Sequence, residues 1–303
     1  MRRALPIVLS LLSLPVFAQS QDRPAITGVA FIRVYTTDPA AAQTFYGHTL
    51  GYNRIEAGDA WVYTVNRLQW VEVLQHTPPP DPNSRLAAIG FTTRDTAALE
   101  RYLKAHDVAI VQPLHDGEFS VRDPEGHLIY FVQSVAPKGT AKLVAAAPPS
   151  LNAASHRIIH VGFVVRDKDK ENAFYRTLLG FKPYWFGGQK DGQLDYMSQQ
   201  VPEGTDWLEY MLHSNPNPTL QTNGGQNHFS LGVADIHSVL GQLERNGCAD
   251  DACRNIHPGR DGKIQLNLFD PDHTRAEFME FKPVLKPCCS PFTGPPPGPE
   301  ESR

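Results

Sequence analysis

The sequence predicts an α+β protein with two tandem domains, each made of two βαβββ units. Three observations indicate this arrangement. A strand-and-helix pattern near the beginning recurs in the second half, each copy is followed by short strands and a further helix, and a segment rich in Ala, Pro, Ser and Lys separates the copies. With 303 residues, the chain is long enough for two domains with their own cores.

The repeat is visible at four places along the chain. The segment TFYGHTLGY at 44–52 matches AFYRTLLGF at 173–181, so Phe45 corresponds to Phe174, an offset of 174 minus 45, or 129, residues. Three further matches follow in the same order in both halves: WVEVL at 70–74 with WLEYM at 207–211, the helical segment 95–106 with 235–245, and DPEG at 123–126 with DPDH at 270–273. An internal duplication accounts for this order.

Composition sets the outer boundaries of the domains. We expect the first domain at 27–135 and the second at 157–283. The segment 136–156 between them has the composition of a linker. From residue 284 to 303 the chain is Pro-rich and poor in packing residues, so we expect a disordered tail. Turn-rich stretches near the middle of each half divide each domain into its two units.

The first strand of the second domain and the helix after it are the clearest elements. In HVGFVV at 160–165, alternate residues point to opposite faces of a sheet. Asp167 is a suitable N-cap, and Gly180 suits a left-handed C-terminal cap because it lacks Cβ. A strand at 29–34 and a helix at 38–51 occupy the corresponding places in the first domain.

The N-terminus has the composition of a secretory signal peptide. Arg2 and Arg3 precede an apolar run at 4–17, which ends in residues of the size that signal peptidase accepts. We expect residues 1–18 to be removed, with Gln19 as the first mature residue. The run is shorter than the roughly 20 apolar residues of a membrane span, which disfavours a retained anchor. The mature protein is therefore expected to be secreted, or periplasmic in a Gram-negative source.

Charge and cysteine content narrow the classes of partner and compartment. A formal net charge of -4 and a pI near 6.3 favour neither nucleic acid nor a membrane surface as a partner. Four cysteines fit an oxidising compartment. Cys248 and Cys253 lie on one polar loop and could close a small disulfide, whereas Cys288 and Cys289 are adjacent in the tail. Their spacing is poor for a metal site and favours a structural role.

Four potential metal ligands lie on four separate predicted strands of the second domain. They are His160, Glu209, His228 and Glu277. Two imidazoles and two carboxylates could surround one divalent ion; they suit Fe, Mn, Zn, Ni or Co, and the lack of thiolates argues against a structural zinc site. Strand alternation places Glu277 on the face of Arg275 and Met279 and places Glu280 on the opposite face, which makes Glu280 the weaker candidate.

The strand-initial His, the FYxxxLGF helix end and the DPxGxxxE-like turn resemble the vicinal oxygen chelate superfamily, which contains glyoxalases, bleomycin-resistance proteins and extradiol dioxygenases. The resemblance covers nearly the whole mature chain. It implies that each pair of βαβββ units forms a cup-shaped sheet with a metal on its concave face. It also implies that one divalent ion, Fe²⁺ or Zn²⁺, Ni²⁺ or Mn²⁺, is bound at the ligand positions His160, Glu209, His228 and Glu277.

The first domain differs from this pattern. Its residues at the family's ligand positions are Phe31, Glu72, Ala88 and Tyr130, so one carboxylate remains. We therefore expect no catalytic metal there. The first domain should have a structural or substrate-shaping role, and the single active centre should lie in the second domain.

The resemblance implies a metal-dependent enzyme that acts on a small oxygen-bearing substrate, and it leaves two reactions open. Extradiol-type dioxygenases hold their metal with two His and one Glu, which His160, His228 and Glu277 would match. Glyoxalase-like lyases and isomerases use a fourth ligand where Glu209 stands, and this Glu can also move protons. We take Glu209 and His257 as the catalytic candidates.

Some positions depart from the dioxygenase pattern. Asn267 stands near the place where those enzymes usually have a Tyr, and His273 replaces the Gly of the turn. His257 precedes Pro258 and is equally compatible with an exposed loop, and the same ambiguity applies to His213. The reaction therefore stays open between oxygen insertion and proton transfer.

A binding protein that sequesters a small molecule, of the bleomycin-resistance type, is the alternative to an enzyme. Such proteins generally lack the metal ligands, which disfavours this hypothesis. Trp207 shares the face of Glu209 and could line the pocket, whereas Tyr210 has the opposite parity and is expected in the core. The expected partner is a small-molecule substrate, and the chain is expected to be a monomer or a homodimer.

Overall fold

The computed structural model of the chain describes residues 22–77, 79–212, 215–248 and 250–299. The predicted signal segment at 1–18 and His213 lie outside these described residues. No helix within them combines the length and the apolar character needed to cross a bilayer.

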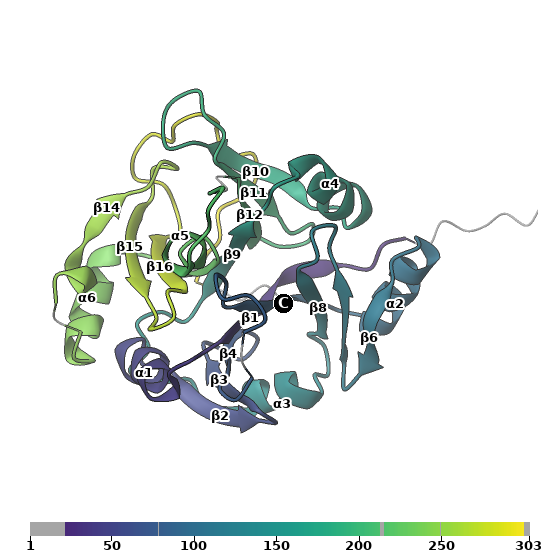
Figure 1. The fold of residues 1–303 in the computed structure, drawn as a ribbon, viewed down its shortest axis with the longest axis horizontal. Helices are drawn as coiled ribbons and strands as arrows, with labels where there is room; N and C mark the ends of the chain where they lie inside the picture. The colour runs from purple at the N-terminus through teal and green to yellow at the C-terminus, as the bar shows by residue number, and fades with distance from the viewer. Residues whose placement is uncertain (1–21, 78, 213–214, 249, 300–303) are drawn as a thin grey trace, which may run out of the picture.

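Two eight-stranded sheets with the same strand arrangement confirm the predicted α+β fold of two tandem domains (Figure 1). The first sheet has the order β2-β3-β4-β1-β5-β8-β7-β6, and the second has the order β10-β11-β12-β9-β13-β16-β15-β14. In each sheet, the first strands of the two units are antiparallel neighbours at the centre. Each of these two strands also pairs in parallel with the last strand of its own unit.

The first domain is built from these elements: β1 (Ile26–Tyr35), α1 (Pro39–Gln43), the π-helical η1 (Thr44–Thr49), β2 (Asn53–Ala57), β3 (Ala60–Thr64), β4 (Trp70–Leu74), β5 (Leu86–Thr93), α2 (Thr96–Ala105), β6 (Ile110–His115), β7 (Glu118–Arg122) and β8 (Leu128–Gln133). The helix α3 (Gly139–Ala146) follows it.

The second domain repeats the order: β9 (Ile158–Val164), α4 (Lys168–Asn172), the π-helical η2 (Ala173–Leu178), β10 (Lys182–Gly187), β11 (Tyr196–Gln200), β12 (Trp207–Met211), α5 (Leu220–Gly224), β13 (His228–Val233), α6 (Ile236–Arg245), the 3₁₀ turn η3 (Ala252–Arg254), β14 (Ile256–Pro258), β15 (Ile264–Phe269) and β16 (Arg275–Glu280).

The first helix of each domain ends in a π-helical turn over the repeated FY motif. The Asp167 side chain caps the second-domain helix by accepting a hydrogen bond from the Lys170 amide, as predicted. Gly51 and Gly180 then reverse the chain with φ of 79° and 76°, values that favour glycine. The repeated FYxxxLG segment thus forms the same helix end, a π-helical turn followed by a left-handed glycine, in both domains.

The main apolar core is continuous between the two domains. Phe91 of β5 meets the ring of Phe181 edge-on, with 5.3 Å between the ring centroids, and Tyr46 stacks near Phe229 at 6.5 Å. The main helices lie around the outside of the molecule, as Figure 1 shows. The two sheets are thus held in a fixed relation by buried side chains.

The linker segment contains a helix that its composition did not predict. In α3, Ala141 and Val144 are buried in one cluster with Phe31, Trp70 and Tyr130 on the inner face of the first sheet. Packing against this apolar surface supplies the stabilisation that an isolated eight-residue helix lacks. The linker therefore covers the cup of the first domain.

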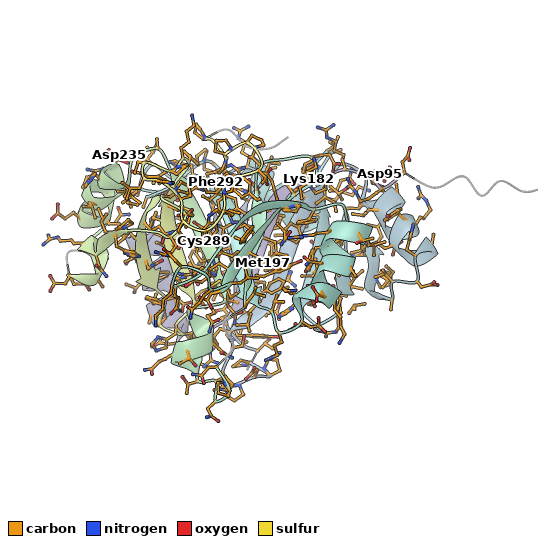
Figure 2. All side chains as sticks on the ribbon, turned by 90° about the horizontal axis from the view of Figure 1, so that it is seen from above. Asp95, Lys182, Met197, Asp235, Cys289 and Phe292 are labelled. Atoms are coloured by element: carbon orange, nitrogen blue, oxygen red, sulfur yellow. A yellow bond between two sulfur atoms is a disulfide. The ribbon has the colours of Figure 1, made fainter. Side chains whose placement is uncertain are left out.

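The expectation of a disordered tail is wrong for the residues up to 295. The Thr293 amide donates to the Tyr184 carbonyl at 3.0 Å, the Phe186 amide donates to Ser290 Oγ at 2.9 Å, and Phe292 packs on Tyr184 with 4.9 Å between centroids. Figure 2 shows Phe292 over the body of the second domain. The tail has too few apolar residues to fold by itself, but the edge strand β10 supplies partners for its backbone and side-chain hydrogen bonds.

The cysteines follow the expected structural role. Cys248 is joined to Cys253, and Cys288 is joined to Cys289 at the beginning of the tail. The Cys288 amide also donates to the Arg260 carbonyl at 2.9 Å.

Candidate metal centre

The four predicted ligands converge on the concave face of the second sheet. His160 lies on β9, Glu209 on β12, His228 on β13 and Glu277 on β16. The Nε2 atoms of the two histidines are 3.0 Å apart, Glu209 Oε2 is 3.2 Å from His228 Nε2, and Glu277 Oε2 is 3.3 Å from His160 Nε2. The donor atoms of His160, Glu209 and His228 all lie within 4.8 Å of one another, as the ligands of a single ion do, and Glu277 lies beside His160.

Strand register and one glycine allow the histidines to meet. His228 pairs with Gly162 across β13 and β9, and a Cβ on Gly162 would lie 2.2 Å from the His228 ring. A side chain at position 162 would therefore displace this imidazole. The His160 ring in turn stacks on Trp207, the register partner of His160 on β12, at 4.5 Å between centroids.

The surroundings of each imidazole keep it neutral. His228 Nδ1 lies 2.9 Å from the Gln226 carbonyl oxygen, an acceptor that requires the proton on Nδ1 and leaves the Nε2 lone pair free. Burial, together with the positive charge of Arg275, lowers the pKa of His228 to about 3. Burial also lowers the pKa of His160. Neutral Nε2 atoms are the form in which imidazoles bind metals.

The two carboxylates have pKa values shifted in opposite directions. Burial raises the pKa of Glu209. Burial acts in the same sense on Glu277, but Arg275 and His160 outweigh it and hold that pKa well below its usual range. Glu277 is therefore ionised throughout the neutral range, while Glu209 is the carboxylate better suited to take up a proton.

Two buried atoms of this cluster have no hydrogen-bond partner, and their surroundings fit a cation. Glu277 Oε2 and His160 Nδ1 have no hydrogen-bond partner and are buried. Two carboxylates at the bottom of one cup are costly to bury without a compensating positive charge. The donor set of two imidazoles and two carboxylates therefore fits a divalent transition metal.

The remaining sequence candidates lie outside the ligand set. Glu280 faces away, as its parity indicated, and accepts a hydrogen bond from the Ile236 amide at 3.2 Å. His257 lies at the wall of the neighbouring cavity, with its Nε2 atom 3.3 Å from Asn267 Nδ2. His273 adopts φ of 65° in the turn before β16 and takes the place that a Gly would fill.

The first domain has no equivalent donor set at the corresponding positions. Phe31 stacks on Trp70 at 5.2 Å, and the Glu72 carboxylate is engaged by the Arg33 guanidinium and by Trp70 Nε1. Arg33 also lies over the Tyr130 ring at 4.6 Å. Aromatic side chains and an internal ion pair thus fill the space that the four potential ligands occupy in the second domain.

A cavity of about 240 Å³ opens beside Glu209 and Glu277. Its lining includes Trp185, Trp207, His257, Asn267, Arg275 and Phe292. The cavity thus lies directly against two of the four potential ligands. Phe292, which comes from the tail beyond the predicted domain boundary at residue 283, forms part of the cavity wall.

Sequence reasoning missed a buried lysine at this site. Lys263 precedes β15, is fully buried, and has its Nζ atom 4.3 Å from the Trp207 ring centroid and 4.0 Å from Asp261. Burial lowers its pKa to about 8, while burial raises the pKa of Asp261 to about 6. No periodicity marks Lys263 in the sequence, because it lies in a turn.

Comparison with known proteins places this geometry in a family. A sequence model of the Glyoxalase/Bleomycin resistance protein/Dioxygenase superfamily matches residues 28–131 and 157–278. The chain belongs to this superfamily. No curated protein sequence matches the chain significantly.

Solved structures of the superfamily share the fold at low sequence identity. The Mn(II)-bound glyoxalase from Novosphingobium aromaticivorans aligns with a TM-score of 0.60 at 14% identity, over 85% of this chain and 83% of its own. A catechol 2,3-dioxygenase aligns with a TM-score of 0.61 at 14% identity, over 88% and 91% of the two chains. The E323L mutant of homoprotocatechuate 2,3-dioxygenase from Brevibacterium fuscum aligns at 0.60 and 18% identity, over 85% and 72%. At these identities, the similarity establishes the fold of both domains.

Proposed function

We propose that this protein is a metal-dependent enzyme of the superfamily, with one divalent ion held by His160, Glu209, His228 and Glu277 in the second domain. The observation that carries the proposal is that these four residues meet on one face of the sheet, with the buried Glu277 Oε2 near His160 but without a hydrogen-bond donor. A divalent metal bound there would act as a Lewis acid on two neighbouring oxygens of a small substrate.

Within this function, a lyase or isomerase reaction based on proton transfer is favoured by Glu209. Its carboxylate lies among the donor atoms, as a fourth ligand would, and also lines the cavity through which a substrate enters. Burial raises its pKa, which makes it a better base than Glu277. In this role, Glu209 would accept a proton from the carbon next to a chelated oxygen and return it to the neighbouring carbon.

Ring-opening dioxygenase chemistry is the second candidate. His160, His228 and Glu277 alone form a set of two His and one carboxylate, the ligand type of non-haem iron oxygenases. His257 lies at the wall of the same cavity, where it could exchange protons with a bound catechol. Asn267 beside it has no ionisable group, which disfavours this reaction relative to the first.

Elemental analysis of the protein purified without chelators tests the metal and separates the two reactions. We expect one equivalent of metal in the wild type and loss of that metal in His160→Ala. Zinc, nickel, cobalt or manganese would support the lyase or isomerase reaction, and iron would support the dioxygenase. A protein that neither contains metal nor takes it up on reconstitution would be a binding protein on the same fold.

Two assays then distinguish the reactions directly. Proton transfer predicts that hydroxy-ketone and 2-oxoaldehyde hemithioacetal substrates exchange carbon-bound hydrogen for deuterium in D₂O, as followed by proton NMR. Glu209→Gln should slow this exchange by about 10²-fold or more. Oxygen consumption with catechols, and none of this exchange, would instead establish the dioxygenase.

Location and assembly are proposals of their own. We propose that residues 1–18 direct export and are cleaved before Gln19; N-terminal sequencing of the protein from its native host tests this. We also propose that the tandem chain completes its cup without a second copy. Light scattering during gel filtration should give the mass of a monomer, whereas a homodimer would contradict this.

A further inference from the structure

The cavity wall contains an arginine whose one acidic neighbour is a proposed metal ligand. Arg275 begins β16, two residues before the proposed ligand Glu277, and lines the cavity. Its Nε atom is buried and has no hydrogen-bond partner, and its Nη1 atom lies 3.6 Å from Glu277 Oε1, a long distance for an ion pair. A guanidinium whose side chain is only 16% exposed, with one long ion pair and an unsatisfied Nε–H, is costly to bury unless a further group binds to it.

The neighbouring strand offers an unsatisfied polar atom beside it. Asn267 on β15 pairs in register with Glu277, and its Oδ1 atom is buried without a partner. Both unsatisfied groups line the same cavity, next to the proposed metal ligands. Since buried polar groups in folded proteins are normally hydrogen-bonded, Arg275 Nε indicates a ligand group that accepts a hydrogen bond, and Asn267 Oδ1 indicates a second ligand group, such as a hydroxyl, that donates one.

A balance of charges shows which sign this ligand group should have. A divalent ion would be neutralised by Glu209 and Glu277. Lys263 lies 4.0 Å from Asp261, and Arg260, at the outer wall, is bound by Asp191 and by the Gly188 carbonyl. Once the ion is bound, Arg275 is therefore the cation at this cavity that has no acid of its own among the described residues.

We propose that the substrate of this enzyme carries a carboxylate, separate from its chelating oxygens, and that Arg275 binds this carboxylate. This inference rests on the proposed function, because it assumes a substrate chelated at the metal centre. A guanidinium matches a carboxylate with two parallel hydrogen bonds, and the pair is stronger in a cavity screened from water. Trp185 and Phe292, at the cavity wall, would pack on the apolar part of the substrate.

Equilibrium binding to the zinc-loaded protein tests this without turnover. The probes are two catechols of matched size, 3,4-dihydroxyphenylacetate and 4-ethylcatechol, and two hydroxamates, the monohydroxamate of succinate and butyrohydroxamate. In each pair the chelating group is the same and only the first member carries a remote carboxylate. We expect the carboxylate member of at least one pair to bind the wild type about tenfold more tightly. In Arg275→Gln this preference should fall below about twofold.

Two matched variants and a metal measurement make the result specific. Arg275→Lys keeps the charge but not the planar fork, and should retain part of the preference. Arg260→Gln changes an arginine of the same wall that already has partners, and should leave the preference intact. Arg275→Gln must still contain one equivalent of zinc.

The proposal would be overturned if the wild type bound the carboxylate and the neutral member of both pairs with equal affinity. It would also be overturned if the preference for the carboxylate member were lost in Arg260→Gln and kept in Arg275→Gln. Failure of the proposed function looks different. In that case zinc is not retained, or no chelator of either pair binds to the loaded protein.

Discussion

The Tyr46 hydroxyl donates a 2.7 Å hydrogen bond to Asp270 Oδ2 across the boundary between the two domains. The duplication produces the reciprocal contact, in which the Tyr175 hydroxyl donates to Asp123 Oδ2 at 3.2 Å. In both contacts, the FY motif of one domain meets the DP turn of the other. The repeated FY motif and DP turn therefore connect the two domains and do not contribute to the candidate metal site.

Replacing Tyr46 by Phe should destabilise the protein by about 1–3 kcal/mol at pH 8, because it removes the donor to Asp270 Oδ2, while the amides of Asp272 and Thr274 still donate to Oδ1. Burial raises the pKa of Asp270 to about 7. Above that pH the ionised carboxylate depends on the hydroxyl, so the loss should be larger at pH 8 than at pH 5.5. Urea denaturation at both pH values measures it. Tyr52→Phe is the control: its hydroxyl donates to a neutral carbonyl, that of Ser155, and its loss should be smaller and independent of pH.

The raised pKa of Glu171 predicts that the free energy of unfolding decreases as the pH rises. It is fully buried near Asp123, Glu125 and Asp167, and burial followed by these charges raises its pKa to about 8. The folded state therefore holds a proton that the unfolded chain releases near pH 4.5, so stability falls between about pH 4.5 and 8 and then levels off. Glu171→Gln should remove this slope and stabilise the protein at pH 8.5 by roughly 1 kcal/mol or more. Thermal unfolding across this range checks it; an unchanged slope would contradict the assignment.

Metal retention should depend on His228 and not on Glu280. His228→Ala removes a donor atom at the centre of the cluster and should lower the metal content from one equivalent to less than about a tenth. Glu280→Ala removes an acceptor for the Ile236 amide, so it should cost about 1 kcal/mol of stability and leave the metal in place. Elemental analysis and denaturation of both variants separate the two effects. Equal metal contents would show that the ligand set is wrong.

The first domain should contribute stability and no metal. Glu72→Gln removes the partner of the Arg33 guanidinium, which is only 18% exposed, and should destabilise the protein by about 2–4 kcal/mol. The metal content should stay at one equivalent for the whole chain. A second equivalent in the wild type that Glu72→Gln removes would contradict this expectation.

The tail should be part of the cavity. Phe292→Ala removes a ring that packs on Tyr184 and should lower stability by about 1–2 kcal/mol. It should also weaken binding of catechols to the metal-loaded protein several-fold, since the cavity loses an aromatic wall. Isothermal titration measures the second effect. Leu285→Ala, an exposed position earlier in the tail, should change neither quantity.

The sequence alone determined the fold class, and it also predicted the four residues that we propose as ligands, which the structure places on adjoining strands of one sheet. Period-two alternation selects the face of a strand to which a side chain points, so Glu277 could be separated from Glu280 without coordinates. The repeated helix end and DP turn are local signals, and two copies in the same order identified the tandem arrangement. The sequence also predicted that the first domain lacks this ligand set, because the residue types differ at the positions that correspond to the four ligands of the second domain.

Tertiary structure decided what covers each cup and which charges face the site. The sequences of helix α3 and of the tail segment around Phe292 show no hydrophobic periodicity. Both segments are ordered by the apolar surfaces on which they pack. Lys263 and Arg275 have their effect because burial and distance set their charges against specific carboxylates. Such relations join residues far apart in the chain, and electrostatic energy depends on separation and solvent exposure in space, which local sequence does not encode.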